Sequence, residues 1–247
     1  MRQELTWLTL KRASSVAQAH QQRRFYFACK RLLDILIAGS ALIILSPLML
    51  VIAILVKLDS PGPAIFKQER VGLRRRTDDQ RKAREVSTFT CYKFRTMYRN
   101  ADSDLHRTFF RAFIRNDHTG MVAVQGEDTQ VRKLTHDPRV TRVGGFLRKS
   151  SLDELLQLWN VLKGDMSLVG PRPPIPYEVD MYEPWHRQRL ETKPGLTGLW
   201  QVTARSSADF DQMVRLDIQY IERQSFWLDL KLLLKTPVAV LSSKGAM

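Results

Sequence analysis

Apolar residues run from position 35 to position 56 without a single charged side chain between them. A helix rises roughly 1.5 Å per residue, so this run is long enough to cross the hydrocarbon core of a bilayer. Lysine and arginine are abundant on both sides of it. The positive-inside rule favours the cytoplasmic side for each flank, and a single straight span satisfies only one of them.

A Ser46-Pro47 pair near the middle of the run offers a solution. Proline lacks a backbone N–H and clashes with the preceding turn, so the helix is expected to bend there. We therefore expect a re-entrant membrane hairpin over residues 29–60, made of helix, break and helix. The Ser46 hydroxyl is a candidate partner for a backbone group freed at the break. A tilted, proline-kinked helix that spans the membrane is the alternative.

The rest of the pattern predicts an α+β fold, mostly helical with short strands. Residues 1–28 are basic and are expected to form a surface helix on anionic lipid or to be partly disordered, whereas residues 61–247 form one domain. Expected elements of that domain are strands at 64–72 and 88–97, helices at 102–115, 153–163, 177–190, 209–223 and 225–241, and a tight loop at 193–198. The last helix has the pattern of an interfacial amphipathic helix or, equally, of a core helix.

A formal net charge of +14 indicates acidic partners: nucleic acid, anionic lipid or phosphorylated substrates. Residues 74–85 are the densest charged run and predict a solvated loop or a lipid-facing patch. Cys29 and Cys91 have no disulfide or metal spacing and are expected to be reduced. The charge leaves open a membrane-tethered nucleic-acid-binding or scaffold protein, although no helix-turn-helix, zinc, RNP-like or P-loop pattern occurs.

Two adjacent carboxylates, Asp153 and Glu154, stand in the predicted first turn of an apolar helix, and a rigid turn with Arg172 follows that helix. A helix N-terminus favours anions, so carboxylates, a phosphate and a divalent metal can gather there. This arrangement suits phosphoryl chemistry. The alternative is structural: Ser151 and Glu154 also fit a capping box, and the neighbouring apolar positions fit a core-facing stripe, Leu152, Leu155, Leu156 and Trp159.

Several motifs, in this order, resemble the bacterial sugar transferase family from about Phe25 to the C-terminus. They are Lys30-Arg31-x-x-Asp34, Lys93-Phe94-Arg95-Thr96-Met97, Ser151-Leu152-Asp153-Glu154-Leu155, Gly164-Asp165-Met166-Ser167-Leu168-Val169-Gly170-Pro171-Arg172-Pro173 and Lys193-Pro194-Gly195-Leu196-Thr197-Gly198-Leu199-Trp200-Gln201-Val202. The resemblance is to the small monotopic phosphoglycosyl transferases, which start glycan assembly on polyprenol phosphate. It implies a re-entrant helix at Ser46-Pro47 and a catalytic domain over residues 61–247.

The resemblance also implies a two-step reaction. Asp153 would attack the sugar-bearing phosphorus of a UDP-sugar and release UMP, and undecaprenyl phosphate would then take the phosphosugar from Asp153. Mg²⁺ would bind beside Asp153, and Glu154 could share it or accept a proton. The implied place is the bacterial inner membrane, on its cytoplasmic face, at the first step of exopolysaccharide, capsule or O-antigen synthesis. Anionic lipid is an expected partner, nucleic acid is not, and a homodimer is left open.

Cations in the matching motifs are the expected ligands of the substrate phosphates, since arginine gives paired hydrogen bonds to such groups. They are Lys93, Arg95, Arg148, Arg172 and Arg205. The chain departs from the family pattern at Leu156, where proline is usual, at Ala204, where glycine is usual, and in the longer segment 74–85. A positive φ at Ala204 would cost about 1 kcal/mol and would shift Arg205. Residues 173–178 resemble members specific for hexoses such as glucose or galactose.

Overall fold

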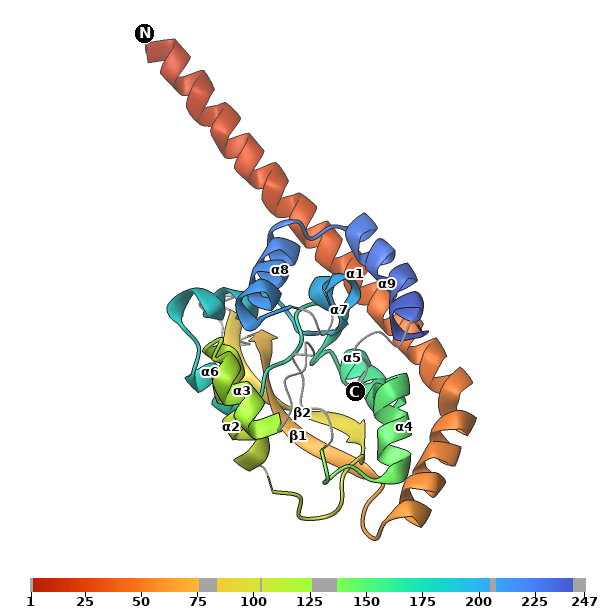
Figure 1. Ribbon diagram of the computed structural model, residues 1–247. Coiled ribbons are helices and arrows are strands. Elements are labelled where there is room, and N and C mark those ends of the chain that lie inside the picture. Colours follow the sequence, from red (N-terminus) through yellow and green to blue (C-terminus); the bar gives the residue numbers. More distant parts are fainter. Residues whose placement is uncertain (1, 76–83, 103, 126–136, 205–207, 242–247) are drawn as a thin grey trace.

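The computed structural model describes residues 2–75, 84–102, 104–125, 137–204 and 208–241 (Figure 1). The described residues are mostly helical with a few strands, which is compatible with the expected α+β class. The elements are α1 (Arg2–Asp59), β1 (Ile65–Arg75), β2 (Arg84–Phe94), α2 (Asp104–Ile114), α3 (His118–Gln125), α4 (Arg142–Ser150), the 3-10 turn η1 (Leu152–Glu154), α5 (Gln157–Lys163), β3 (Ser167–Val169), α6 (Pro176–Asp180), the 3-10 helix η2 (Pro184–Leu190), β4 (Gly195–Thr197), α7 (Leu199–Thr203), α8 (Phe210–Glu222) and α9 (Phe226–Leu241).

Two small sheets support the site. β1 and β2 form a long antiparallel hairpin, and β3 pairs with β4 in parallel. The segment expected as a tight loop at 193–198 is therefore partly strand. Close contact between the backbones at Gly170 and Gly195 makes this pairing possible, because a Cβ on Gly195 would overlap the Gly170 amide.

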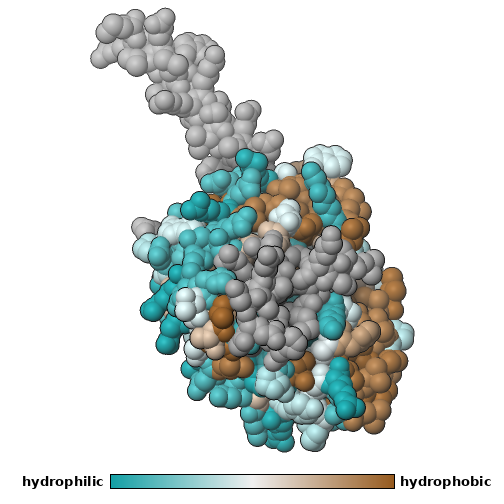
Figure 2. Space-filling view, viewed as in Figure 1, coloured by the Kyte–Doolittle hydropathy of each residue, from teal (hydrophilic) through white to brown (hydrophobic). Residues whose placement is uncertain are grey.

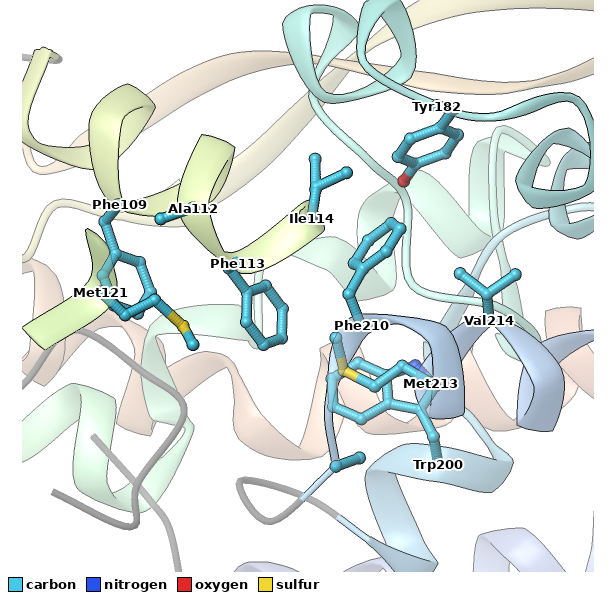
Figure 3. Packing of buried hydrophobic residues seen from close by; sticks show 11 residues of the cluster. Phe109, Ala112, Phe113, Ile114, Met121, Tyr182, Trp200, Phe210, Met213 and Val214 are labelled. Carbon is cyan, nitrogen blue, oxygen red and sulfur yellow. The ribbon is translucent and has the colours of Figure 1, made fainter. Parts of the chain in front are cut away.

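A core rich in aromatic side chains is formed by α2, α3, α7 and α8 together with Tyr182, which lies just before η2 (Figure 3). The rings of Phe113 and Phe210 meet at 5.9 Å between centroids in an edge-to-face arrangement. The expected helix at 177–190 is wrong as one element: it divides into α6 and η2, and Pro184 opens the second part. α3 was not expected, because residues 116–135 show no clear apolar period.

α1 continues through the Ser46-Pro47 pair, so the expected break is not an interruption of the helix. Proline lacks the N–H that would bond to the Ile43 carbonyl four residues earlier. The Ser46 hydroxyl donates a hydrogen bond of 2.8 Å to that same carbonyl. The carbonyl freed by proline is therefore satisfied within the helix, as expected of Ser46. Figure 1 shows that the orange part of α1 turns away from the line of its red part.

Buried charged groups just before the apolar run hold this part of α1 against the domain. Lys30 Nζ lies 2.7 Å from Asp229 Oδ2 on α9. One turn later, Asp34 accepts hydrogen bonds from the Leu168 amide at 2.9 Å and from the Ser167 hydroxyl at 3.1 Å, both on β3. The motif Lys30-Arg31-x-x-Asp34 thus holds α1 against two elements of the domain.

The second half of the segment packs on the same domain. Ile52 and Val56 are buried against Phe94 of β2 and Leu147 of α4. Asp59 Oδ2 accepts a hydrogen bond of 3.1 Å from the Val143 amide at the start of α4. Both ends of the apolar run therefore contact one domain.

Between these contacts, α1 leaves a large apolar surface uncovered. Residues Arg24–Asp59 are long and apolar enough to cross a membrane by length and composition, and only 11% of their most apolar 18-residue stretch is buried. Ile43 and Ile44 are 77% and 73% exposed. Apolar side chains of α9, among them Trp227 and Leu234, are also exposed. Figure 2 shows brown surface along α1 at the right edge and near α9 at the top.

Candidate active site

The adjacent carboxylates lie in a 3-10 turn between two helices. Ser151 adopts a left-handed conformation with φ 57°, which ends α4, and η1 carries Asp153 and Glu154 before α5 begins at Gln157. The expected α-helical first turn is therefore corrected to η1. As the stripe predicts, three leucines pack against the buried cluster of Ile52, Val56, Phe94 and Leu147: Leu152, Leu155 and Leu156. Trp159 is 49% exposed and does not belong to this packing.

Glu154 is engaged by cations from two other elements. Lys93 Nζ, near the end of β2, donates a hydrogen bond of 2.6 Å to Glu154 Oε1. Arg172 Nη1 lies 3.6 Å from the same oxygen. The Ser151 side chain makes no capping hydrogen bond, so the capping-box alternative is wrong. Three motifs that are far apart in sequence thus meet at one carboxylate.

The two carboxylates differ in charge environment. Burial acts to raise the pKa of Glu154, but Lys93 and then Arg172 outweigh it and hold that pKa well below its ordinary value. Burial, supported by the charge of Glu154 and opposed by Lys93, raises the pKa of Asp153. Within the described residues no hydrogen bond reaches the Asp153 carboxylate. Glu154 is therefore a fixed anion, and the oxygens of Asp153 remain available.

Arg148 approaches the pair from the last turn of α4. Its Nε donates a hydrogen bond of 3.0 Å to Thr96 Oγ1. Burial lowers its pKa, against the opposing charges of Asp137 and Asp153. In the described part of the chain neither of its terminal nitrogens forms a hydrogen bond, so the fork of the guanidinium can serve an anionic ligand beside Asp153.

Arg95 has a different place from the one expected. Its Nη1 donates to the Pro61 carbonyl at 2.7 Å, and its Nη2 donates to the carbonyls of Ser60 at 2.6 Å and Val56 at 3.2 Å. It caps the C-terminus of α1 and does not join the carboxylate pair. Lys93 lies within β2, whereas Arg95 follows the last residue of that strand, Phe94, so the strand does not hold the two side chains on one face.

Arg205 and residues 76–83 of the charged segment lie outside the described residues. Ala204 has φ −121°, so the left-handed strain considered for this position does not arise. Leu156 has φ −66°, an ordinary helical value, and the absence of the usual proline changes nothing in the local backbone.

A second group of residues near the arginines was not found from the sequence. His106 Nδ1 lies 2.5 Å from the Tyr177 hydroxyl. Burial, and after it the charge of Arg70, lowers the pKa of His106 to about 4, so the pair is neutral near pH 7. Arg70 is buried and donates a hydrogen bond of 2.8 Å to the Pro173 carbonyl, which fixes the turn that carries Arg172. Neither α2 nor β1 carries a spacing that points to this chemistry.

The described residues contain no group of three or more His, Cys, Asp or Glu side chains that could hold a metal ion. Mg²⁺ commonly uses one or two carboxylates and completes its shell with substrate phosphates and water. The available oxygens of Asp153 fit such a site. Glu154 Oε1 is already bound to Lys93, so Asp153 is the better ligand and the second oxygen of Glu154 is the secondary one. Cys29 and Cys91 are free thiols, as expected.

Comparisons with known proteins find relatives over most of this chain. Residues 25–243 match the family described as bacterial sugar transferase. The galactosyl transferase CpsE of Streptococcus agalactiae is 41% identical over 225 residues, 90% of this chain and 44% of that protein. The undecaprenyl-phosphate galactose phosphotransferase of Salmonella typhimurium is 42% identical over 88% of this chain and 41% of its own length. The exopolysaccharide production protein ExoY of Sinorhizobium fredii is 41% identical over 88% of this chain and 87% of its own length. The chain therefore spans less than half of the first two relatives.

Proposed function

Because this chain belongs to the bacterial sugar transferase family, we propose that it transfers a sugar-1-phosphate from a UDP-sugar to undecaprenyl phosphate. The products are UMP and undecaprenyl-diphosphate-sugar. Among relatives, the Salmonella protein is named for transfer to undecaprenyl phosphate, and the Sinorhizobium protein is named for exopolysaccharide production. The Streptococcus and Salmonella relatives are named as transferases, which favours this hypothesis over a nucleic-acid-binding or scaffold role.

One observation carries the proposal: of two adjacent carboxylates, one is paired with cations and the other is not hydrogen-bonded within the described residues. Glu154 is held as an anion by Lys93 and Arg172. Asp153 has no hydrogen bond within the described residues, and the positive charge of Arg148 acts on it. A structural acid pair would be satisfied on both members. A nucleophile must instead keep an oxygen free for its target, which is the state of Asp153.

In the first step, an Asp153 oxygen attacks the sugar-bearing phosphorus of the UDP-sugar. A carboxylate-oxygen to phosphorus bond forms while the bond from that phosphorus to the bridging oxygen breaks, and the electron pair leaves with UMP. Lys93, Arg148 and Arg172 offset the negative charge that builds on the phosphate oxygens. Mg²⁺ bound beside Asp153 would polarise the phosphate under attack.

In the second step, an oxygen of undecaprenyl phosphate attacks the same phosphorus. The new phosphorus-oxygen bond forms the diphosphate, and the Asp153 carboxylate is released as the leaving group. No net proton is needed, because the nucleophile and the leaving group are both anions. Glu154 stays charged in both steps. Its ion pairs keep Lys93 and Arg172 next to the carboxylates when the phosphates of the substrate attract these cations.

The donor is proposed to be a UDP-hexose such as UDP-galactose or UDP-glucose. Two of the relatives are named for galactose or galactosyl transfer. The segment after Arg172 carries the hexose-like motif at residues 173–178, and its Tyr177 lies beside His106. Anionic lipid near the exposed lysines of α9 and a second copy of the chain complete the expected partners.

The re-entrant hairpin is proposed as the membrane topology, with the domain on the cytoplasmic face of the inner membrane. Two findings support it. The Lys30–Asp34 end and the Ile52–Asp59 end of the apolar run contact the same domain. The uncovered apolar residues, Ile43 and Ile44 among them, lie between these ends. A helix that spans would place its ends on opposite sides of the bilayer.

The test is the Asp153→Asn variant in detergent or nanodiscs with Mg²⁺. We expect no UMP release above background and no covalent label from UDP-sugar radiolabelled in the sugar-1-phosphate group. Wild-type protein without lipid acceptor should retain about one label per chain and should lose it when undecaprenyl phosphate is added. Asp180→Asn is the matched control, because Asp180 is an exposed carboxylate at the end of α6. Full turnover by Asp153→Asn would overturn the proposal.

A further inference from the structure

Thr96 sits where the end of β2 meets α4, next to the site but without a place in the reaction described above. We propose that Thr96 is a positioning residue, which orients the guanidinium of Arg148 toward the phosphate groups at Asp153. This inference rests on the proposed function, because it assigns a role to a residue that acts only through Arg148.

The start of α4 packs directly against the backbone of Thr96. The Thr96 carbonyl accepts a hydrogen bond of 3.0 Å from the Thr141 amide. Thr141 is the N-cap of α4 and accepts a hydrogen bond of 3.0 Å from the Gly144 amide. A Cβ on Gly144 would overlap the Thr96 carbonyl oxygen, so glycine at this position lets the helix rest directly on the Thr96 backbone. The distance between Thr96 and α4 is thereby fixed.

The side chain of Thr96 then reaches one turn further along the same helix. Arg148 follows Gly144 by four residues, and residues four apart share a helix face. Thr96 is buried, and its hydroxyl oxygen lies 3.0 Å from Arg148 Nε. A guanidinium is planar, so a bond at Nε fixes the plane in which the two terminal nitrogens point. Those nitrogens are the ones without hydrogen bonds within the described residues.

The neighbouring residue shows that this strand end orders two elements at once. Arg95 binds the carbonyls at the C-terminus of α1, whereas Thr96 binds α4 and Arg148. The dipeptide therefore ties the end of the apolar helix to the arginine of the site. Holding a long, flexible arginine in one orientation before substrate binds reduces the entropy lost on binding and favours the transition state.

The experiment compares Thr96→Val, which keeps the shape and removes the hydroxyl, with Thr96→Ser, which keeps the hydroxyl. We expect Thr96→Val to lower kcat/KM for UMP release about tenfold, since hydrogen bonds to charged groups are worth roughly that factor or more. Thr96→Ser should stay within about twofold of wild type. Thr96→Ala removes the hydroxyl without adding a buried methyl group and provides the same comparison if Thr96→Val does not fold.

A double-mutant cycle separates positioning from a purely structural effect. In an Arg148→Ala background, Thr96→Val should lower kcat/KM no further, because the residue it orients is gone. Additive losses in the cycle, or wild-type kcat/KM in Thr96→Val, would overturn the inference. Asp153→Asn is assayed in parallel: if it turns over, the proposed function fails, whereas an inactive Asp153→Asn with an unaffected Thr96→Val overturns the positioning role alone.

Discussion

Lys93 Nζ lies 2.6 Å from Glu154 Oε1, and this contact joins the end of β2 to the turn that carries both carboxylates. The ion pair is only partly exposed, with side-chain exposures of 15% for Lys93 and 20% for Glu154. Breaking such a pair by removing one partner leaves the other charge poorly solvated. Lys93 therefore compensates the negative charge of Glu154 next to Asp153 and, in the proposed reaction, the negative charge of the substrate phosphates.

Lys93→Met should lower kcat by about 10- to 100-fold, since a cation that stabilises the transition state is lost and Glu154 is left uncompensated. The measurement is UMP release at saturating UDP-sugar. Lys163→Met is the matched control, because Lys163 pairs with Asp165 at 2.9 Å on a surface where its side chain is 44% exposed. Equal effects of the two substitutions would contradict a special role for Lys93.

The rate of covalent labelling should depend on the protonation of Asp153. Burial, supported by Glu154 and opposed by Lys93, raises the pKa of Asp153 from 3.8 to about 6. The protonated acid is not a nucleophile, so labelling should fall about tenfold per pH unit below that value. The profile is measured by quenched labelling at low Mg²⁺. Higher Mg²⁺ stabilises the carboxylate and should move the midpoint to lower pH; a midpoint that ignores Mg²⁺ would contradict metal binding at Asp153.

The same carboxylate should oppose folding stability near neutral pH. Because the pKa of Asp153 is higher in the folded protein than its ordinary 3.8, the folded state binds more protons in that range. The free energy of unfolding contributed by Asp153 therefore decreases as the pH rises from about 4 to about 6. Glu154 acts in the opposite direction, because its pKa is lowered to about 2, and its contribution is lost on acidification below its ordinary 4.5.

We accordingly expect Asp153→Asn to be more stable than wild type at pH 7 although it is inactive. Denaturant midpoints of the two proteins at pH 4 and pH 7 provide the test. The difference between them should shrink at pH 4, where the wild-type carboxyl is neutral in the folded protein. A variant that is less stable at pH 7 would contradict the unfavourable burial of this charge.

Gly144→Ala should destabilise the protein by about 1–3 kcal/mol, because the added methyl group meets the Thr96 carbonyl in a packed contact. Gly145→Ala is a matched control on the same helix, since a Cβ at Gly145 has no atom within 4 Å. That change should be neutral or stabilise by up to about 1 kcal/mol, as alanine favours helix over glycine. Urea unfolding in detergent measures the stability of both variants. Equal midpoints would contradict the close packing of α4 against the Thr96 backbone.

The hairpin predicts that both ends of the apolar run face the cytoplasm. A cysteine introduced at Gln3 and one at the exposed Lys57 should each resist a membrane-impermeant maleimide added to intact spheroplasts and should react after lysis. A background with Cys29 and Cys91 replaced by serine removes the native thiols. Labelling of either position before lysis would show a spanning helix.

The sequence predicted most reliably those elements whose apolar period is strong. The helix expected at 209–223 matches α8, with Asp209 as its N-cap, and the run at 35–56 lies within α1. The family motifs brought Lys93 and Arg172 to the candidate site as phosphate ligands, and the structure places both beside Glu154. Motif order cannot say how a strand ends, and so it placed Arg95 at the site when its side chain turns to the carbonyls of α1.

Other features depended on tertiary contacts that no local pattern encodes. His106 and Tyr177 are 71 positions apart, and their contact follows from how α2 packs on the rest of the domain. Ser151 in a left-handed conformation changed the expected α-helical start into η1, because the chain must turn there for the leucines to reach α1. Local propensity is overridden at such positions by burial of the neighbouring apolar side chains.

The burial of Ile52 and Val56 between Phe94 and Leu147 has a practical consequence. The apolar helix α1 supplies part of the hydrophobic core of the domain and does not act as a separable membrane anchor. Trimming it to obtain a water-soluble fragment would open a hole beside the strand end and the helix that flank the carboxylates. Preparations of this protein should therefore keep α1 intact in detergent or nanodiscs, because a protein truncated to improve its solubility would misfold.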